Sequence, residues 1–356
     1  MVVKLSRRDF LKLAGTALGG LAFSPYIKSA AQFDDSPLIR VGIAQVSVYH
    51  LPADDSRIVR QVFRDDILHV YEEVTAPTPA WNPVWYRVWG GYVNRAHMPK
   101  VQLIYNEPAK SIRETKQLAE VTVPYSQPLR LINKVWQPIQ DWLLYYGTVH
   151  WVIGVLEEGP DGQPWYTVQD QLLPITYIVP ATHLRLIPDE EIAPISPEVP
   201  FENKRIEVSL YDPTSAQTLT CYEYDKVVLH TTISSGLPTP NLGANGISTL
   251  TPTGDKRIEV KMPSKHMGNG SLEAGIDSYE LLGVPWCSFF TDQGHAFHGT
   301  YWHDNFGNQM SHGCINMRTE EAKWLFRWCL PPAPADQISP LTLDKKGYGT
   351  PVKIKS

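Results

Sequence analysis

Ser311-His312-Gly313-Cys314-Ile315-Asn316 is the stretch that most strongly restricts the fold and the chemistry of this chain. His298 lies sixteen residues before Cys314. A free thiol with a pKa of roughly 8.5 is only a few per cent thiolate at neutral pH, so a nucleophilic cysteine needs a neighbouring base. Gly313 leaves the backbone beside the sulfur without a Cβ, so main-chain N–H groups can turn towards a developing oxyanion. The stretch therefore indicates nucleophilic catalysis by a cysteine.

The spacing of this motif resembles the signature of the L,D-transpeptidases, the YkuD-type enzymes that remodel bacterial peptidoglycan. Twelve residues separate His298 from Ser311, and an apolar residue and an asparagine follow the cysteine, as in that family. Three further segments are similar to segments of the family: Ser234-Ser235-Gly236, Thr251-Pro252-Thr253-Gly254 and Gly349-Thr350-Pro351-Val352. The resemblance covers residues 202–356, which we expect to form the catalytic domain.

The resemblance implies a role for each residue of the motif. Cys314 is expected to be the nucleophile, and His298 the general base and later the general acid. The main-chain carbonyl of Gly299 is expected to orient the other ring nitrogen of His298. Ser311 is expected to fix the loop through its hydroxyl, and the amides of Gly313 and Cys314 to stabilise the oxyanion.

Substrate contacts are expected from a second group of residues: Gly299, Trp302, His303, Asn316 and Arg318. Trp302 and His303 are expected to line the acceptor side of the cleft. Asn316 either orients the loop or binds substrate. Arg318 either pairs with a substrate carboxylate or is solvated at the start of a helix.

Four histidines near Cys314 raise the alternative of a zinc site: His295, His298, His303 and His312. Their spacing fits no common closed structural zinc site, and a metal bound to Cys314 would quench the nucleophile. We therefore expect neither a metal nor another cofactor. His312 either helps to shape the site beside the thiolate or makes a purely structural hydrogen bond.

Composition limits the class of protein. A chain of 356 residues is too long for one ordinary domain, and 43% hydrophobic residues suffice for real cores. The net charge of −5 gives no electrostatic case for nucleic-acid binding, which requires a basic surface. Eleven tryptophans, 17 tyrosines and 30 prolines favour a mainly β chain.

Residues 38–102 are expected to form a β-barrel. Arg57–Phe63 and Ile67–Val74 nearly alternate between apolar and polar residues, which is typical of strands. Trp85–Val93 predicts a tight hairpin around Gly90-Gly91. The order Trp-Tyr-x-Val followed by Gly-Tyr-Val resembles the end of a bacterial SH3-like module.

Residues 103–190 repeat part of this pattern. Trp165-Tyr166-Thr167-Val168 and Tyr177-Ile178-Val179 follow the same order, so the segment is either a second, diverged SH3-like module or one irregular β domain. Residues 191–201 are expected to be a linker. The overlapping stretch 188–200 has four prolines and four acidic residues, which indicates a semi-rigid linker or strap.

The catalytic region, 202–356, is expected to be a β-sandwich with one short helix, as the resemblance implies. Thr218–Tyr224 and Lys226–Thr232 flank Asp225 like the two strands of a hairpin. The helix is predicted to follow the cysteine, with Thr319 as its N-cap. Its apolar stripe is Ala322, Leu325, Phe326 and Cys329, and Pro331-Pro332 ends it.

Residues 1–31 are expected to be a twin-arginine signal peptide, so the protein is expected to meet the twin-arginine export machinery and to act outside the cytoplasm at the cell wall. Arg7-Arg8 lies in a fitting context, an apolar run from Leu13 to Phe23 follows, and Ser29-Ala30-Ala31 suits a signal peptidase. The cysteines outside the motif are either small buried residues, which we favour, or include one disulfide: Cys221, Cys287 and Cys329.

The resemblance implies a peptidoglycan L,D-transpeptidase whose partners are stem peptides and the cell wall. Its cysteine would release D-alanine from a tetrapeptide stem and pass the acyl group to the amine of another stem. An L,D-carboxypeptidase that uses water as the acceptor and a non-catalytic wall-binding protein are the alternatives. The paired His298 and Cys314 argue against the non-catalytic alternative.

Overall fold

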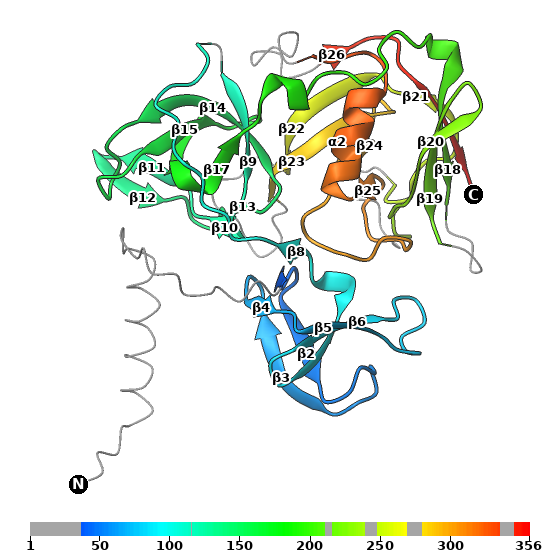
Figure 1. Ribbon diagram of the computed structural model, residues 1–356, viewed down its shortest axis with the longest axis horizontal. Coiled ribbons are helices and arrows are strands. Elements are labelled where there is room, and N and C mark those ends of the chain that lie inside the picture. Colours follow the sequence, from blue (N-terminus) through cyan, green and yellow to red (C-terminus); the bar gives the residue numbers. More distant parts are fainter. Residues whose placement is uncertain (1–36, 115, 211–215, 239–247, 269–279, 335–344) are drawn as a thin grey trace. The chain divides into compact units, whose positions relative to one another are not determined.

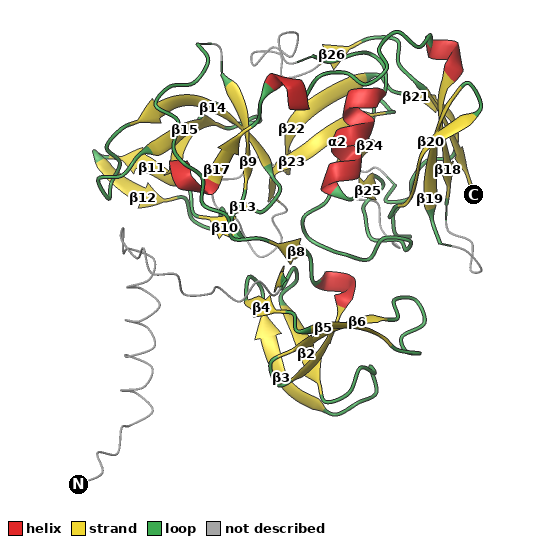
Figure 2. Cartoon of the chain, viewed as in Figure 1, coloured by secondary structure: helices red, strands yellow, loops and turns green. Residues whose placement is uncertain are grey.

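The computed structural model describes residues 37–114, 116–210, 216–238, 248–268, 280–334 and 345–356 (Figure 1). The expected signal peptide lies outside these residues. Strands dominate the described chain and helical segments are few, which confirms the prediction of a mainly β protein (Figure 2). No helix among the described residues is long and apolar enough to cross a membrane.

The N-terminal region contains two antiparallel sheets around one apolar core. The first has the order β4-β1-β8, with strands β4 Ile67–His69, β1 Leu38–Arg40 and β8 Lys100–Val101. The second has the order β3-β2-β7-β6-β5, with strands β3 Ile58–Phe63, β2 Gln45–Tyr49, β7 Gly91–Asn94, β6 Val84–Val88 and β5 Glu72–Thr75. Gly90 has a φ of 86° in the turn between β6 and β7, so the predicted paired-glycine hairpin is confirmed.

The middle region is built on a seven-stranded antiparallel sheet with the order β12-β11-β16-β15-β14-β9-β17. Its strands are β9 Gln117–Val121, β11 Leu129–Ile132, β12 Val135–Pro138, β14 Val149–Leu156, β15 Trp165–Gln169, β16 Thr176–Pro180 and β17 Leu184–Leu186. A separate pair joins β10 Tyr125–Ser126 to β13 Leu144–Tyr145. The segments that suggested a repeated pattern are the neighbouring strands β15 and β16.

Two five-stranded sheets form the C-terminal region. One has the order β20-β19-β18-β27-β21, with β18 Lys204–Ser209, β19 Thr218–Glu223, β20 Lys226–Thr232, β21 Gly254–Arg257 and β27 Pro351–Lys355. The other has the order β25-β24-β23-β22-β26, with β22 Val260–Gly268, β23 Glu280–Phe289, β24 Ala296–Gly299, β25 Ile315–Met317 and β26 Lys345–Lys346. Tyr224 and Asp225 have positive φ angles of 52° and 78° between β19 and β20, which confirms the predicted hairpin.

One helix, α2 Thr319–Trp328, packs on β23 and β24 (Figure 1). Its buried residues join those of both sheets in one core cluster, which includes Ile206 and Phe297. The predicted N-cap is wrong by one residue, because Arg318 occupies that position with extended backbone angles and makes no side-chain cap bond. Thr319 is the first helical residue.

Two buried lysines secure the C-terminal end of α2. Lys204 Nζ donates to the carbonyls of Ile195, Ser196 and Trp328 at 2.7–3.1 Å. Lys261 Nζ donates to the carbonyls of Cys329 and Pro331 at 2.8 and 2.9 Å. Positive charge at this end satisfies carbonyls that the helix leaves unpaired and complements the helix dipole.

The proline-rich stretch before the C-terminal region lies against the same helix. Ile192 and Val199 are buried. The main-chain N–H of Ile195 donates to the carbonyl of Arg327 at 2.9 Å, and Nε of Arg327 donates to the carbonyl of Ala193 at 2.8 Å. Two short 3-10 turns, Asp189–Glu191 and Phe201–Asn203, border this segment. The segment is therefore a packed strap that helps to hold α2 in place.

Candidate active site

Cys314 and His298 lie on the same face of two neighbouring parallel strands. In the register of β24 and β25, Phe297 is opposite Ile315 and His298 is opposite Asn316. Side chains alternate between the faces of a sheet, so Cys314, directly before β25, shares the face of Asn316. The fold thereby brings the nucleophile candidate and the base candidate together, although sixteen residues separate them in sequence.

His298 is held in one tautomer. Its Nδ1 lies 3.0 Å from the main-chain oxygen of Gly299, which can only accept a hydrogen bond. Nδ1 therefore carries the proton in the neutral ring, and Nε2 keeps a free lone pair. The hydrogen bond to Gly299 is the one that the sequence motif implied. The Trp302 ring packs beside the imidazole, with the two ring centroids 5.7 Å apart.

The thiol and the imidazole are both neutral at rest. Burial raises the pKa of the Cys314 thiol to about 11, and the main-chain N–H of Ala296 opposes this only in part. Burial lowers the pKa of His298 to about 4, against the effect of Gly299. The thiol faces the carbonyl of Gly294, with Sγ 3.8 Å from the oxygen. A neutral imidazole is competent to accept a proton from the thiol as substrate arrives.

Ser311 shapes the loop that carries the cysteine. Its hydroxyl donates to the carbonyl oxygen of Cys314 at 2.5 Å and accepts from the amide of Gly313 at 3.2 Å. The Gly313 amide is thus already used within the loop, which departs from the expectation that it stabilises an oxyanion. The amide of Cys314 is the better candidate for that role.

Gly313 permits a close approach that no other residue would allow. Its φ is 115°, and a Cβ there would lie 2.8 Å from Cδ2 of His295. His295 is buried, and its Nδ1 lies 2.9 Å from the hydroxyl of Thr291. His295 therefore acts as a support beneath the loop, and the sequence signal for it was the glycine that faces it.

Thr251 links two upstream segments to the catalytic loop. Its hydroxyl accepts from the amide of Gly236 and donates to the carbonyl of Gly313, both at 2.9 Å. Ser234 and Gly236 also form isolated β-bridges to Asn316 and Ser311, on either side of Cys314. The two upstream segments of the resemblance therefore meet the loop of Cys314 in space. Sequence reasoning gave Thr251 no role of its own.

His303 and Asn316 are buried and paired with each other. The side-chain amide of Asn316 lies 2.9 Å from Nε2 of His303, and Nδ1 of His303 accepts from the main-chain amide of Asn305 at 3.2 Å. Burial lowers the pKa of His303 to about 3, so this ring is neutral. Their burial favours positioning of β25 over contact with a substrate, which is a different role from the cleft lining expected for His303.

The remaining candidates lie around the same loop. Arg318 is half-exposed, donates to Thr231 Oγ1 at 3.3 Å and lies 3.5 Å from a carboxylate oxygen of Glu321. Its guanidinium carbon is 4.6 Å from the centre of the Phe306 ring. His312 is exposed, whereas Gly299 is buried beneath α2, where a Cβ would lie 3.0 Å from Cα of Thr319.

The residues outside the motif fill structural places. Cys221, Cys287 and Cys329 are buried free thiols in the C-terminal region. Within the described ranges, no group of three histidine, cysteine or carboxylate side chains is arranged to hold a metal ion.

The C-terminal region is similar to known proteins. Residues 203–354 match the family model described as the L,D-transpeptidase catalytic domain, YkuD. No curated protein matches the chain. Among solved structures, the chain is similar to a mutant L,D-transpeptidase from Enterococcus faecium, with 26% identity, 44% of this chain and 50% of that chain covered, and a TM-score of 0.30. The matched part thus spans half of that relative.

Two further structures are similar to this chain. The catalytic domain of the Enterococcus faecium L,D-transpeptidase shares 26% identity over 43% of this chain and 98% of that chain, with a TM-score of 0.29. An L,D-transpeptidase from Mycobacterium smegmatis shares 15% identity over 74% of this chain and 92% of that chain, with a TM-score of 0.30. Residues 203–354, less than half of the chain, are thus similar to the L,D-transpeptidase catalytic domain of the YkuD type.

Proposed function

We propose that this chain is a peptidoglycan L,D-transpeptidase with Cys314 as its nucleophile. As a donor stem binds, the thiol proton moves to Nε2 of His298 and Sγ attacks the carbonyl carbon of the third residue, a diamino acid. The bond to D-alanine breaks, and His298 delivers the proton to the leaving amine. A thioester on Cys314 remains.

The second half-reaction returns the enzyme to its starting state. The amine of another stem attacks the thioester and gives its proton to His298, which passes it to the departing thiolate. The Cys314 amide would stabilise the oxyanion in both steps. Water in place of the amine would make the enzyme a carboxypeptidase.

One observation carries the proposal. His298, fixed in the Nδ1–H tautomer by Gly299, shares a sheet face with Cys314 inside a domain that matches the L,D-transpeptidase model. A free lone pair on Nε2 is what abstraction of a thiol proton requires.

The test is incubation of the purified protein with muropeptides, followed by mass analysis of the products. Cross-linked dimers together with released D-alanine support transpeptidation. D-alanine release without dimers identifies the carboxypeptidase, and the absence of both with wild-type protein contradicts the proposal. Cys221→Ala is the matched control, because this thiol is buried in the core of the sandwich.

We also propose that residues 1–31 direct twin-arginine export to the cell wall and that residues 38–190 hold the enzyme there. Arg7-Arg8 and the apolar run after it support the first part, and the two β regions before the catalytic domain support the second. Bound modules would raise the local concentration of substrate. Arg7→Lys with Arg8→Lys should retain the protein in the cytoplasm, and unchanged export would contradict this part.

A further inference from the structure

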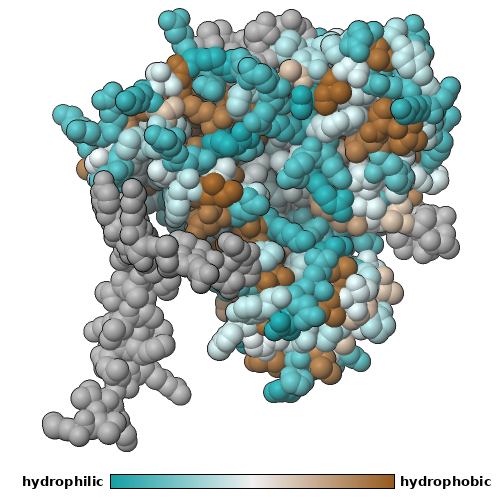
Figure 3. All heavy atoms as spheres, viewed as in Figure 1, coloured by the Kyte–Doolittle hydropathy of each residue, from teal (hydrophilic) through white to brown (hydrophobic). Residues whose placement is uncertain are grey.

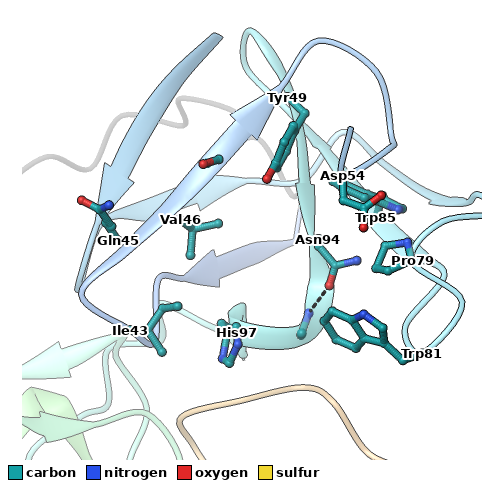
Figure 4. Close-up of a pocket in the computed structure, with 12 residues that line it drawn as sticks. Ile43, Gln45, Val46, Tyr49, Asp54, Pro79, Trp81, Trp85, Asn94 and His97 are labelled. Carbon is teal, nitrogen blue, oxygen red and sulfur yellow. Dashed lines mark hydrogen bonds between the residues drawn. The ribbon is translucent and has the colours of Figure 1, made fainter. Parts of the chain in front are cut away.

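The N-terminal sheets contain a cavity of about 190 Å³ that the catalytic mechanism does not use (Figure 4). Its lining is mainly apolar and includes Ile43, Val46, Tyr49, Pro79 and Trp81. Figure 4 shows Trp81, Pro79 and Asp54 along one side, with Ile43 and Val46 across from them. A space of this size takes the end of a side chain rather than a whole drug-sized ligand.

Asp54 supplies the charge in this cavity. Its side chain is exposed, and within the described ranges no cation forms an ion pair with it. Asn94, another polar residue of the wall, is already engaged: it accepts from Ala96 N at 3.0 Å and donates to the carbonyl of Asn82 at 2.9 Å. The Trp85 indole N–H likewise donates to the carbonyl of Thr78 at 2.8 Å.

The aromatic rings add a second feature that suits a cation. Trp81 is 53% exposed, which is high for an indole and leaves its ring available to a ligand. Tyr49 and Trp85 stand at 90° to each other with ring centroids 5.6 Å apart. Aromatic faces attract ammonium groups, and an alkyl chain packs along apolar walls while its charged end reaches a carboxylate. His97 also lines the cavity, and burial lowers its pKa, which favours the neutral ring that does not repel a cation.

The cavity lies beside the loop that follows His298. The carbonyl of Trp81 accepts from Asn308 Nδ2 at 2.8 Å, and the carbonyl of Ala96 accepts from the amide of Asp304 at 3.0 Å. A Cβ on Gly42 would lie 2.3 Å from the carbonyl oxygen of Trp302, so the main chains touch here. A ligand in the cavity would therefore be held close to the loop that carries Trp302 and His303.

Figure 3 shows hydrophobic residues on one face of the molecule in separate groups rather than in one continuous patch. The cavity of the N-terminal sheets, at about 190 Å³, is too small for a protein interface, which needs a larger apolar area. Asp54 is the one carboxylate among the described residues of the lining, which otherwise combines apolar and aromatic walls with neutral polar side chains such as Gln45 and Ser47.

We propose that this cavity, with Asp54 and Trp81 as its main contacts, binds the alkylammonium side chain of a peptide. That this side chain belongs to a stem peptide of peptidoglycan rests on the proposed function. The binding of an alkylammonium group in the cavity does not depend on that function. In the enzyme, the cavity would hold a stem close to the catalytic loop.

The test compares two ligands on the full chain carrying Cys314→Ala, which cannot turn over. The probes are a stem tetrapeptide with a free side-chain amine and the same peptide with that amine acetylated, and calorimetry measures both dissociation constants. We expect the free amine to bind about fivefold more tightly. Asp54→Asn should remove that difference, and Trp81→Ala should weaken the free-amine peptide.

Asp55→Asn is the matched control, because Asp55 is an exposed neighbour outside the cavity lining, and it should retain the fivefold difference. Thermal unfolding of each variant verifies that it is folded. If folded Asp54→Asn protein still binds the free-amine peptide more tightly than the acetylated one, the inference is overturned, because another site would then bind the amine.

The same set of proteins separates this inference from the proposed function. If the wild-type enzyme cross-links muropeptides but its preference for the free amine does not depend on Asp54, the inference about the cavity is wrong and the proposed function stands. If the preference for the free amine depends on Asp54 but the wild-type protein shows no turnover, the proposed function is wrong and the inference about the cavity stands. Raised salt should reduce the fivefold preference, because an exposed ion pair is screened.

Discussion

At the scale of single residues, the catalytic loop depends on contacts that the motif does not contain. Thr251 joins Gly236 to Gly313, and His295 lies beneath the glycine. The motif itself could be read from sequence because its members lie close together along the chain. The link made by Thr251 could not, because its segment is brought near the loop only by the tertiary fold.

Thr251→Val tests the hydroxyl link with little change in shape. It leaves the buried amide of Gly236 and the carbonyl of Gly313 each without that partner, which should cost about 1–3 kcal/mol of stability. Turnover should fall about tenfold as the loop loosens. Thr253→Val, an exposed change in the same segment, is the control, and equal activity in both variants would contradict a role for the link.

Gly313→Ala should nearly abolish turnover in protein that still folds. The methyl group would need His295 to move, and the φ of 115° disfavours any side chain. Gly162→Ala, with φ +74° and no atom within 4 Å of the added Cβ, carries the backbone strain without the clash. Steady-state kinetics and thermal melts of the two variants separate these causes. Normal turnover by Gly313→Ala would show that the loop does not need the close contact.

At the scale of elements, the sequence predicted what depends on local pattern. The hairpins β6–β7 and β19–β20 follow from alternation and from turn residues that tolerate positive φ. The parallel pairs β24–β25 and β18–β27 have no such signal, because distant segments meet there. The apolar stripe predicts the helix correctly, but the preference of threonine for N-caps puts the predicted cap at Thr319, one residue after the observed cap Arg318.

A chain of hydrogen bonds connects the N-terminal sheets to β25. Asn82 Nδ2 donates to Asn305 Oδ1 at 2.8 Å, and the main-chain N–H of Asn305 donates to Nδ1 of His303. The other ring nitrogen of His303, Nε2, lies within hydrogen-bond distance of the Asn316 side chain. Asn82→Ala should therefore lower kcat about threefold to tenfold while changing KM little, because β25 directly follows Cys314, the proposed nucleophile.

The control for Asn82→Ala is Asn106→Ala. Asn106 makes comparable hydrogen bonds in the middle region, to Thr122 Oγ1 at 2.7 Å and to the carbonyl of Thr182 at 3.2 Å. Both variants should lose stability to a similar extent, and calorimetry measures that loss. A matching drop in kcat for Asn106→Ala would mean that general destabilisation, and not the chain of contacts, lowers activity.

At the scale of the whole molecule, buried histidines should make stability sensitive to acid. Burial lowers the pKa of His150 and His303 to about 3, and that of His183 and His298 to about 4. The unfolded chain binds protons at these residues near pH 6.5, so folding loses free energy as the pH falls below that value.

His266 acts in the opposite sense. Burial opposes its protonation, but Asp170 and Glu280 outweigh burial and raise its pKa, so its contribution is lost as the pH rises. The four histidines with lowered pKa values should destabilise the fold at acid pH by more than His266 stabilises it. Calorimetry should therefore show Tm falling by about 5–10 °C between pH 7 and pH 5. A Tm that rises over this range would contradict the account of buried neutral histidines.

The most direct test of the central claim is the mass of the protein after rapid mixing with a tetrapeptide stem. We predict one equivalent of D-alanine released and one acyl group, the stem without its D-alanine, attached to Cys314. Peptide mapping locates the adduct, and Cys314→Ala should give neither product. An acyl group on another residue, or D-alanine released by Cys314→Ala at the wild-type rate, would contradict the assignment of Cys314 as the nucleophile.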